Sequence, residues 1–366
     1  MTGAPIHVIH TVPALFGRDG VVGGAERYAL ELARSMADEV RTTLVAFGDR
    51  DRDETAGALR IRVLGSPWLV RGQRANPMSR RLFAALRPAT VVHCHQQHVL
   101  ASSLAALYCR LTGRRVFVTD LGGGGWDVSA YVSTDRWYHG HLHISAYSRA
   151  VFGHEENPRA HVISGGVDTV KFAPDARTRP GDTVVFVGRL LPHKGIDTLI
   201  RALPEGLRLL VMGARADQRY AADLERLAAG KPVSFVHDAD DAQIIDAYRS
   251  ALCVVLPSVY RTMYGDTTRV LELLGQTLLE GMACGAPGIC TAVASMPEVV
   301  SDGATGFVVP ADDPAVLSER LAWLRDHPEE ARRMGEAARR RVDTQFTWPT
   351  VVRRCLRAYA APDPAR

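Results

Sequence analysis

Short apolar runs recur along the chain and alternate with longer stretches that have apolar residues at helical spacing. In the first half, these runs occupy residues 6–10, 41–47, 59–64, 90–95, 115–119, 142–145 and 161–164. Residues 25–36 carry apolar side chains three and four positions apart, which predicts a helix with one face on a core. Strands that alternate with helices predict an α/β fold with mostly parallel sheets.

A second series of the same kind begins at residue 183, after a polar segment with two prolines at 174–182 that reads as a linker. Its strands are expected at 183–187, 207–212, 233–236 and 251–256, and its helices at 276–284, 313–325 and 328–342. The pattern divides the chain into a first domain at 1–173, a second at 174–345, and a terminal helix within 346–366. Residues 49–54 are charged and are expected to be an exposed connection.

Composition narrows the class of protein. The length of 366 residues suits two domains, and a hydrophobic content of 46% suits large cores. The net charge is only +4 and there is no dense basic run with interleaved aromatics, so we expect no nucleic-acid partner. Six cysteines form no CxxC pair and read as reduced core residues. Without a signal peptide or an apolar run long enough for a bilayer, a cytoplasmic protein is expected.

The arginine-rich stretch at 68–88 allows two interpretations. Residues 68–88 carry five arginines among apolar side chains, at positions 71, 74, 80, 81 and 87. The first reading is a solvated helix face, and the second is a basic amphipathic element that binds a membrane surface or an anionic acceptor.

The richest chemistry lies between Glu272 and Pro310. Gly275 stands where a helix over 276–284 would begin, so the amides of Gly275, Gln276 and Thr277 form its positive end, a site for a diphosphate. Glu280, about one turn in, can accept two hydrogen bonds from ribose hydroxyls. Glu272 can do the same for a sugar hydroxyl. A nucleotide-sugar is the ligand that matches this arrangement.

Two further turns carry groups suited to phosphate. Arg189 and Lys194 lie five positions apart across a strand-to-helix turn, so that both cations can converge on one anion. Gly23 and Gly24 follow the first strand and precede the helix at 25–36, which is the phosphate-facing arrangement of a doubly wound sheet.

These motifs resemble a known family. The strings GGAERY, GRLLPHKGID, GMACGAPGICT and MPEVVSDGATGFVVP, together with the glutamate pair, are similar to family-4 retaining glycosyltransferases of the GT-B fold. The resemblance implies two Rossmann-like domains facing across a cleft, with the C-terminal helix crossing back to the first domain. It implies Arg189, Lys194 and Glu272 as catalytic residues. The donor-binding residues that follow from it and from the helix start are Gly23, Gly24, Gly188, Gly213, His237, Leu274, Gly275, Gln276, Thr277 and Glu280.

Histidines follow the strand at 90–95. His93, Cys94, His95 and His98 invite a metal site, but His93 and Cys94 point to opposite faces of a strand, and no second ligand cluster stands out. We therefore expect no metal. The resemblance instead puts His93, His95 and His98 at the mouth of the cleft, on the acceptor side.

A glycine run marks a departure from the family. Relatives often have a histidine beside the donor sugar where this chain has Leu121. The acceptor-binding residues expected here are Asp120, Trp126 and Asp127, which flank four glycines. A loop at 259–271 is longer than the family usually has and is expected to shape donor or acceptor choice.

The predicted function is transfer of a hexosyl group, with retention, from a nucleoside-diphosphate sugar to a hydroxyl of a small polar acceptor. UDP-sugars are favoured, and natural-product or cell-envelope glycosides are the expected products. Neither a cofactor nor a metal is expected, since the two cations and the helix start can stabilise the departing diphosphate. The alternatives are a membrane-associated glycosyltransferase with a lipid acceptor, a related epimerase or phosphorylase, and a non-catalytic nucleotide-sugar binding protein.

Overall fold

The chain folds into two compact units. The computed structural model describes residues 6–15, 24–122, 125–178, 180–268 and 272–362. Unit 1 consists of Met1–Gly166 and Trp348–Arg366, and unit 2 consists of Val167–Thr347. The chain passes between the units at 166/167 and again at 347/348, whereas the sequence pattern put these changes after residues 173 and 345. Each unit is an α/β domain built on a mostly parallel sheet, so the predicted fold class is confirmed.

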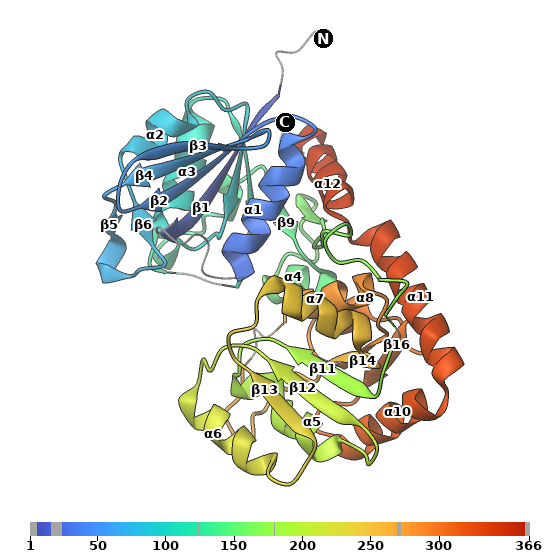
Figure 1. The fold of residues 1–366 in the computed structure, drawn as a ribbon. Helices are drawn as coiled ribbons and strands as arrows, with labels where there is room; N and C mark the ends of the chain where they lie inside the picture. The colour runs from blue at the N-terminus through green and yellow to red at the C-terminus, as the bar shows by residue number, and fades with distance from the viewer. Residues whose placement is uncertain (1–5, 16–23, 123–124, 179, 269–271, 363–366) are drawn as a thin grey trace. The chain divides into compact units, whose positions relative to one another are not determined.

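Unit 1 is built on an eight-stranded sheet with the order β10-β9-β8-β7-β1-β2-β4-β3 (Figure 1). Its strands are β1 (His7–Leu15), β2 (Arg41–Gly48), β3 (Arg52–Ala56), β4 (Leu59–Gly65), β7 (Val91–His95), β8 (Arg115–Thr119), β9 (Gly140–His143) and β10 (Ala160–Val162). Every neighbouring pair is parallel except β3–β4. The strand order reverses beside β1, and crevices at such reversals are where parallel sheets bind ligands.

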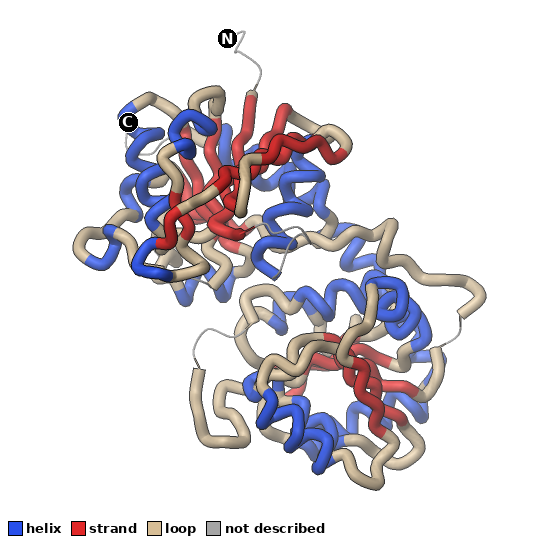
Figure 2. Tube along the Cα trace, turned by 60° about the vertical axis from the view of Figure 1, so that its left-hand side comes forward, coloured by secondary structure: helices blue, strands red, loops and turns tan. Residues whose placement is uncertain are grey.

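Helices cover both faces of this sheet, as Figure 2 shows. Alternate residues of β2 pack on opposite sides: Val45 and Phe47 join the core under α2 (Arg81–Leu86) and α3 (Leu100–Leu111), and Leu44 and Ala46 join the core under α1 (Gly24–Ala37). This two-residue alternation is what the strand geometry requires. The remaining helix of the body, α4 (Ala146–Val151), follows β9.

The C-terminal helix α12 (Trp348–Ala360) packs on unit 1 beside α1. The ring of Trp348 lies edge-on to Tyr28 at a centroid distance of 5.2 Å. At the other end of α12, Arg115 donates to the backbone carbonyl of Ala361 at 2.7 Å. The predicted return of the last helix to the first domain is therefore confirmed.

Unit 2 is built on a six-stranded parallel sheet with the order β13-β12-β11-β14-β15-β16. The strands are β11 (Thr183–Val187), β12 (Arg208–Met212), β13 (Val233–Val236), β14 (Cys253–Leu256), β15 (Gly288–Thr291) and β16 (Gly306–Val309). The helices are α5 (Ile196–Ala202), α6 (Gln218–Leu227), α7 (Asp241–Ser250), α8 (Gln276–Ala283), α9 (Met296–Val299), α10 (Pro314–Asp326) and α11 (Pro328–Gln345). The strands β11 to β14 and the helices α8, α10 and α11 lie where the sequence predicted them.

Two sequence expectations were wrong. The charged segment expected as a connection contains β3, an exposed strand antiparallel to β4 at the edge of the sheet. Charged side chains on an edge strand prevent pairing with other chains. The same charges made this segment resemble an exposed connection in the sequence. The arginine-rich stretch at 68–88 is not one helix but the short strands β5 (Trp68–Leu69) and β6 (Pro77–Met78), the turn η1 (Val70–Gly72) and the short α2.

Among the described residues, no helix combines the length and the apolar character that a membrane crossing needs.

Candidate functional site

The loop that carries Lys194 lies in close contact with the residues that follow β14. The short helix η4 (Pro192–Lys194) ends at Gly195, which has a φ of 65°. A Cβ at Gly195 would lie 2.0 Å from the carbonyl oxygen of Pro257, so only glycine allows the two loops to approach this closely. This contact brings Lys194 to the carboxyl end of the neighbouring strand.

Lys194 forms a buried ion pair with Glu272. Its ammonium donates to the Glu272 carboxylate, and Ser258, at the end of β14, donates to the same oxygen at 3.0 Å. Burial by itself raises the pKa of Glu272, but the charge and hydrogen bond of Lys194 and the hydrogen bond of Ser258 outweigh it, and the pKa is lowered. Glu272 is therefore a carboxylate at neutral pH and acts as a hydrogen-bond acceptor.

The backbone of Glu272 is also fixed. Ser295 donates to the Glu272 carbonyl through its hydroxyl at 2.6 Å and its backbone amide at 3.2 Å. Thr291, at the end of β15, donates to the carbonyl of Ser258 at 2.6 Å. These bonds hold the carboxylate between the ends of β14 and β15.

Arg189 contributes a second cation near the pair. It follows Gly188 at the end of β11, is exposed, and has no charged or hydrogen-bonded side-chain partner within the described part of the chain. His193 lies between the charged groups: its pKa is lowered by burial first, then by the charges of Lys194 and Arg189, while Glu272 opposes them. The structure thus brings Arg189, Lys194 and Glu272 to one place around His193.

The helix start also adopts the predicted geometry. Gly275 precedes α8 with a left-handed φ of 71°, and the turn has no side-chain cap. Its first N–H groups face outward with the positive end of the helix dipole. One turn in, Glu280 is buried and accepts from Tyr248 and from Gln276, each at 3.4 Å. Leu274 is buried, and Gln276 and Thr277 are partly exposed.

Further donor-site candidates lie along the same edge of the sheet. Gly188 and Gly213 directly follow β11 and β12, and a Cβ at Gly213 would lie 2.0 Å from the Gly188 carbonyl oxygen. His237, one residue past β13, has Nδ1 at 3.1 Å from the Gly213 carbonyl oxygen. The predicted residues of unit 2 therefore collect at the carboxyl ends of its strands, where α/β sheets bind their ligands.

Sequence reasoning missed three groups of this site: Ser258, His193 and Ser295. His193 stands inside the string GRLLPHKGID, next to Lys194, and Ser258 comes two residues after the strand β14; these positions are the signals that could have found them. Ser295 carries no such signal, because it reaches Glu272 through a turn that only the fold creates.

The long loop after β14 is tied to both sides of the site. Val259 donates its backbone N–H to the His193 carbonyl at 2.9 Å, and the Tyr260 hydroxyl accepts the N–H of Ala294 at 2.9 Å. A bridge between Arg261 and Thr267 closes the loop into a narrow turn. Residues 269–271 of this predicted insertion lie outside the described residues.

The acceptor candidates of unit 1 are partly committed to the fold. The Asp127 carboxylate is buried and accepts from Ser103 at 2.5 Å and from the Ser129 amide at 2.9 Å, as the cap of a short helix. Trp126 is partly exposed, and the Arg71 guanidinium lies 4.2 Å from its ring centroid. His98 is partly exposed and lies 3.0 Å from the Ser129 hydroxyl.

Asp120 has one oxygen to spare. Its Oδ1 accepts from the Gly122 amide at 2.9 Å and from Gln96 at 3.2 Å, while Oδ2 is buried without a partner. Burial raises the pKa of Asp120, against the hydrogen bonds of Gly122, Gln97 and Gln96. Gln96 has a φ of 99°, a strained conformation of the kind found at binding sites.

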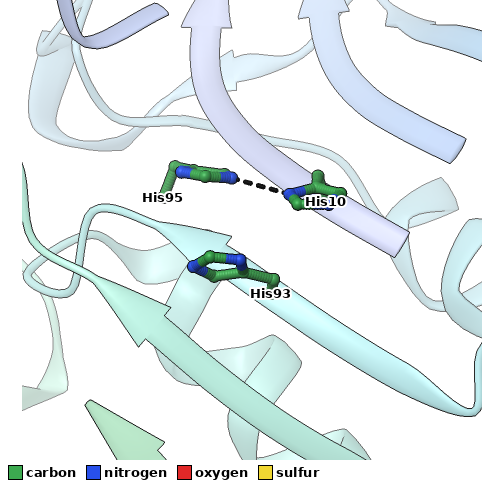
Figure 3. Close-up of side chains that lie close together, drawn as sticks. All are labelled: His10, His93 and His95. Carbon is green, nitrogen blue, oxygen red and sulfur yellow. Dashed lines mark hydrogen bonds between the residues drawn. The ribbon is translucent and has the colours of Figure 1, made fainter. Parts of the chain in front are cut away.

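His93 and His95 lie instead in the core, where Figure 3 shows them beside His10. His95 is paired with His10 at 2.9 Å and stacked on His93 at a centroid distance of 4.4 Å. Both nitrogens of His93 are occupied, by Thr119 at 2.8 Å and by the Tyr359 hydroxyl at 2.7 Å. Cys94 points to the other face, as the strand alternation predicted. We therefore withdraw His93 and His95 from the acceptor site.

Of the two glycines expected near the donor diphosphate, Gly23 lies outside the described residues. Gly24 begins α1 and is exposed, with open space where a Cβ would be. Gly123 and Gly124 of the glycine run also lie outside the described residues.

Comparisons with known proteins agree with this architecture. The family described as glycosyl transferases group 1 matches residues 171–341, and the family described as glycosyltransferase family 4 matches residues 22–171. An α-maltose-1-phosphate synthase of Mycobacterium tuberculosis is 29% identical over 319 residues, which cover 75% of this chain and 80% of that protein.

A second relative and a solved structure add detail. A GDP-mannose-dependent phosphatidylinositol monomannoside mannosyltransferase of Corynebacterium glutamicum is 32% identical over 230 residues, or 56% of this chain and 58% of that protein. The structure of Anabaena HepE in complex with UDP has a TM-score of 0.72 at 15% identity, covering 96% of this chain and 98% of that one.

Proposed function

This chain belongs to the family-4 glycosyltransferases of the GT-B fold and is a nucleotide-sugar-dependent transferase, and from that premise we propose its reaction. The chain moves a hexosyl group from a nucleoside-diphosphate sugar to a hydroxyl of a small polar acceptor, with retained anomeric configuration. The observation that carries this proposal is the buried Lys194–Glu272 pair with Arg189 beside it, at the carboxyl ends of the strands of unit 2.

The two cations and the start of α8 act on the leaving group. Negative charge grows on the diphosphate as the bond to the sugar breaks, and donors fixed in place stabilise that charge without reorganising. Arg189, without a protein partner among the described side chains, is available for the diphosphate. The charge of Lys194 is partly balanced by Glu272. In this proposal the two cations and the helix start stabilise the leaving group without a metal ion.

Glu272 accepts a hydroxyl of the donor sugar in this proposal. Its carboxylate is held by Lys194 and Ser258, and these bonds reduce its strength as a nucleophile. A covalent intermediate on Glu272 is therefore disfavoured, which supports retention by departure and attack on one face of the sugar. Glu280, which accepts from Tyr248 and from Gln276, binds the ribose hydroxyls in this proposal.

The donor base and the acceptor are the finer parts of the proposal. We favour a UDP-sugar, and the structural neighbour solved with UDP supports that choice. The relative named for GDP-mannose makes guanosine donors the first competitor. On the acceptor side, Oδ2 of Asp120 has no partner and can accept from hydroxyl or ammonium groups. His98 and Trp126 complete the proposed acceptor site.

A thermal-shift panel of UDP-, GDP- and ADP-sugars tests the donor, since a ligand that binds only the folded state raises its melting temperature. The stabilising donor is then incubated with candidate sugars and amino sugars, and the anomer formed is read by NMR. A product with the donor's configuration supports the proposal, and an inverted product contradicts retention.

Release of nucleoside diphosphate separates this proposal from a non-catalytic binding protein. A slow transferase hydrolyses its donor in the absence of acceptor, and a protein that only binds does not. The lipid-acceptor alternative stays open, since one relative is named for a phosphatidylinositol acceptor, although the arginine-rich stretch at 68–88 forms no continuous amphipathic helix.

A further inference from the structure

Unit 1 contains two groups of side chains with the ligand types of a metal site. The first is His10, His93 and His95, and the second is Asp135, His141 and His154. In the first group, His10 bonds to His95, His93 bonds to Thr119 and Tyr359, and Nδ1 of His95 has no partner; all three residues are fully buried (Figure 3). Both ring nitrogens of His93 are already hydrogen-bonded, so this group offers a metal fewer than three free nitrogens.

The second group lies where buried polar atoms lack partners. Among the described residues, nine buried side-chain polar atoms have no hydrogen-bond partner, and six of them belong to residues 120–149. Three of these six are Asp120 Oδ2, His141 Nδ1 and His143 Nδ1. Of these atoms, His141 Nδ1 belongs to the second group. Buried polar atoms nearly always have a partner, so this nitrogen points to a bound ligand.

The ligand atoms of this second group are close together. One atom from each of Asp135, His141 and His154 lies within 4.8 Å of the others. The rings of His141 and His154 have centroids 4.1 Å apart. The histidines are buried and the aspartate is exposed, so the group has a route to solvent.

Hydrogen bonds orient each ligand. Nε2 of His141 lies 3.3 Å from the backbone oxygen of Asp135, and because a carbonyl only accepts, Nε2 carries the proton and the buried Nδ1 carries the lone pair. Nδ1 of His154 lies 3.0 Å from Nε2 of His143, which leaves Nε2 of His154 for a ligand. Gln97 donates to Oδ1 of Asp135 at 2.5 Å. Metal-bound histidines usually bond their second nitrogen in this way.

We propose that Asp135, His141 and His154 bind one divalent transition-metal ion, with zinc as the best match to two imidazole nitrogens and a carboxylate oxygen. The ion joins three segments of unit 1: the short helix η3 (Asp135–Trp137), strand β9, and the turn after α4. It fastens the long connection between β8 and β9, which carries Trp126 and Asp127. Its role is to order this connection, separately from the diphosphate site of unit 2.

The test is metal binding by the full chain. Protein stripped with a chelator is dialysed against micromolar Zn²⁺ and its zinc content measured, and Co²⁺ is then used as a coloured substitute. One zinc per chain, a rise in melting temperature, and a cobalt spectrum of nitrogen and oxygen ligands are expected. The Asp135→Asn variant, changed at an exposed position, and Asp135→Asn/His154→Gln should lose the bound metal.

The matched control carries the same two substitutions elsewhere, as Asp49→Asn/His327→Gln, and should bind zinc as the wild type does. Far-ultraviolet circular dichroism establishes that each variant is folded. Wild-type protein that takes up no zinc, or an Asp135→Asn/His154→Gln variant that binds as much as the control, overturns the proposal. A thiolate charge-transfer band with Co²⁺ also overturns it, because the metal would then lie on a cysteine.

Discussion

Lys194 and Glu272 form an ion pair in which each charge is stabilised in the protein interior by the other. Their side chains are only 15% and 10% exposed, and a buried charge that loses its partner is costly. Ser258, His193 and Ser295 surround them and were not found from the sequence. A sequence motif identifies the charged residues of the site. The residues that contact them from distant parts of the chain cannot be predicted from sequence spacing.

We expect Lys194→Met to destabilise unit 2 by about 3 kcal/mol, since it leaves the Glu272 carboxylate buried without a cation. The double variant Lys194→Met/Glu272→Gln should recover most of this loss, because no buried charge remains. Urea unfolding of the wild type, both single variants and the double variant measures the coupling. Additive losses in the double variant would show that the pair is not coupled.

Glu272 and Glu280 are expected to differ in what they bind. Glu280→Gln should weaken binding of the free nucleoside diphosphate, because it removes a bidentate acceptor from the ribose. Glu272→Gln should lower turnover of the donor and leave the affinity for the nucleoside diphosphate near its wild-type value. Calorimetric titration of both variants decides the matter, and equal losses of affinity would contradict the division of roles.

Among the helices, strands and loops, those with strong apolar periodicity were predicted well, including the first four strands of unit 2 in chain order, β11 to β14. The edge strand β3 was missed because its residues Arg52–Ala56 are charged and lack an apolar face. The stretch at 68–88 was interpreted as a solvated helix face or a basic amphipathic element, because arginines among apolar residues resemble an amphipathic pattern. Its break at Gly72 and Pro77 was the contrary signal.

The loop that carries Lys194 depends on Gly195. Gly195→Ala should reduce donor turnover strongly, because its Cβ would lie 2.0 Å from the Pro257 carbonyl and push the loop away from Glu272. Gly230→Ala is the matched control, since Gly230 has a similar φ of 76° but open space around it. The control should lose only about 1 kcal/mol of stability and keep its activity. Similar activity in the two variants would show that the close approach is unimportant.

For the chain as a whole, the division into two α/β units and the return of the last helix were predictable from the repeated strand pattern and the family resemblance. The sequence placed the first domain boundary at 173/174, whereas the units divide at 166/167. The proline-bearing segment at 174–182 resembles a linker although it belongs to unit 2. The buried histidines of unit 1 were unforeseen as a group. Pairing of β1 with β7, which sets His10 beside His93, arises only when the sheet is assembled.

These histidines predict that acid unfolds unit 1 before unit 2. Burial lowers the pKa of His10 to about 3 and lowers the pKa values of His93 and His95, and their neighbours Tyr28 and Tyr359 are uncharged. The unfolded chain binds protons below its ordinary histidine pKa while the folded chain does not, so stability falls as the pH drops from about 6.5 toward 4. Hydrogen exchange at pH 7 and pH 5 should show protection lost first in unit 1. Equal losses in both units would contradict this.

The central claim is that Arg189 and Lys194 hold the departing diphosphate of a sugar donor, and Arg189 gives the cleanest test because its removal leaves no buried charge behind. The rate of nucleoside diphosphate release is measured for the wild type, for Arg189→Ala, and for Arg208→Ala as a control at the opposite end of the strands. Loss of a fixed charge-assisted contact to the leaving group predicts a rate about 10²–10³ lower in Arg189→Ala, with unchanged melting temperature and a control like the wild type. A rate within tenfold of the wild type in Arg189→Ala would contradict the claim.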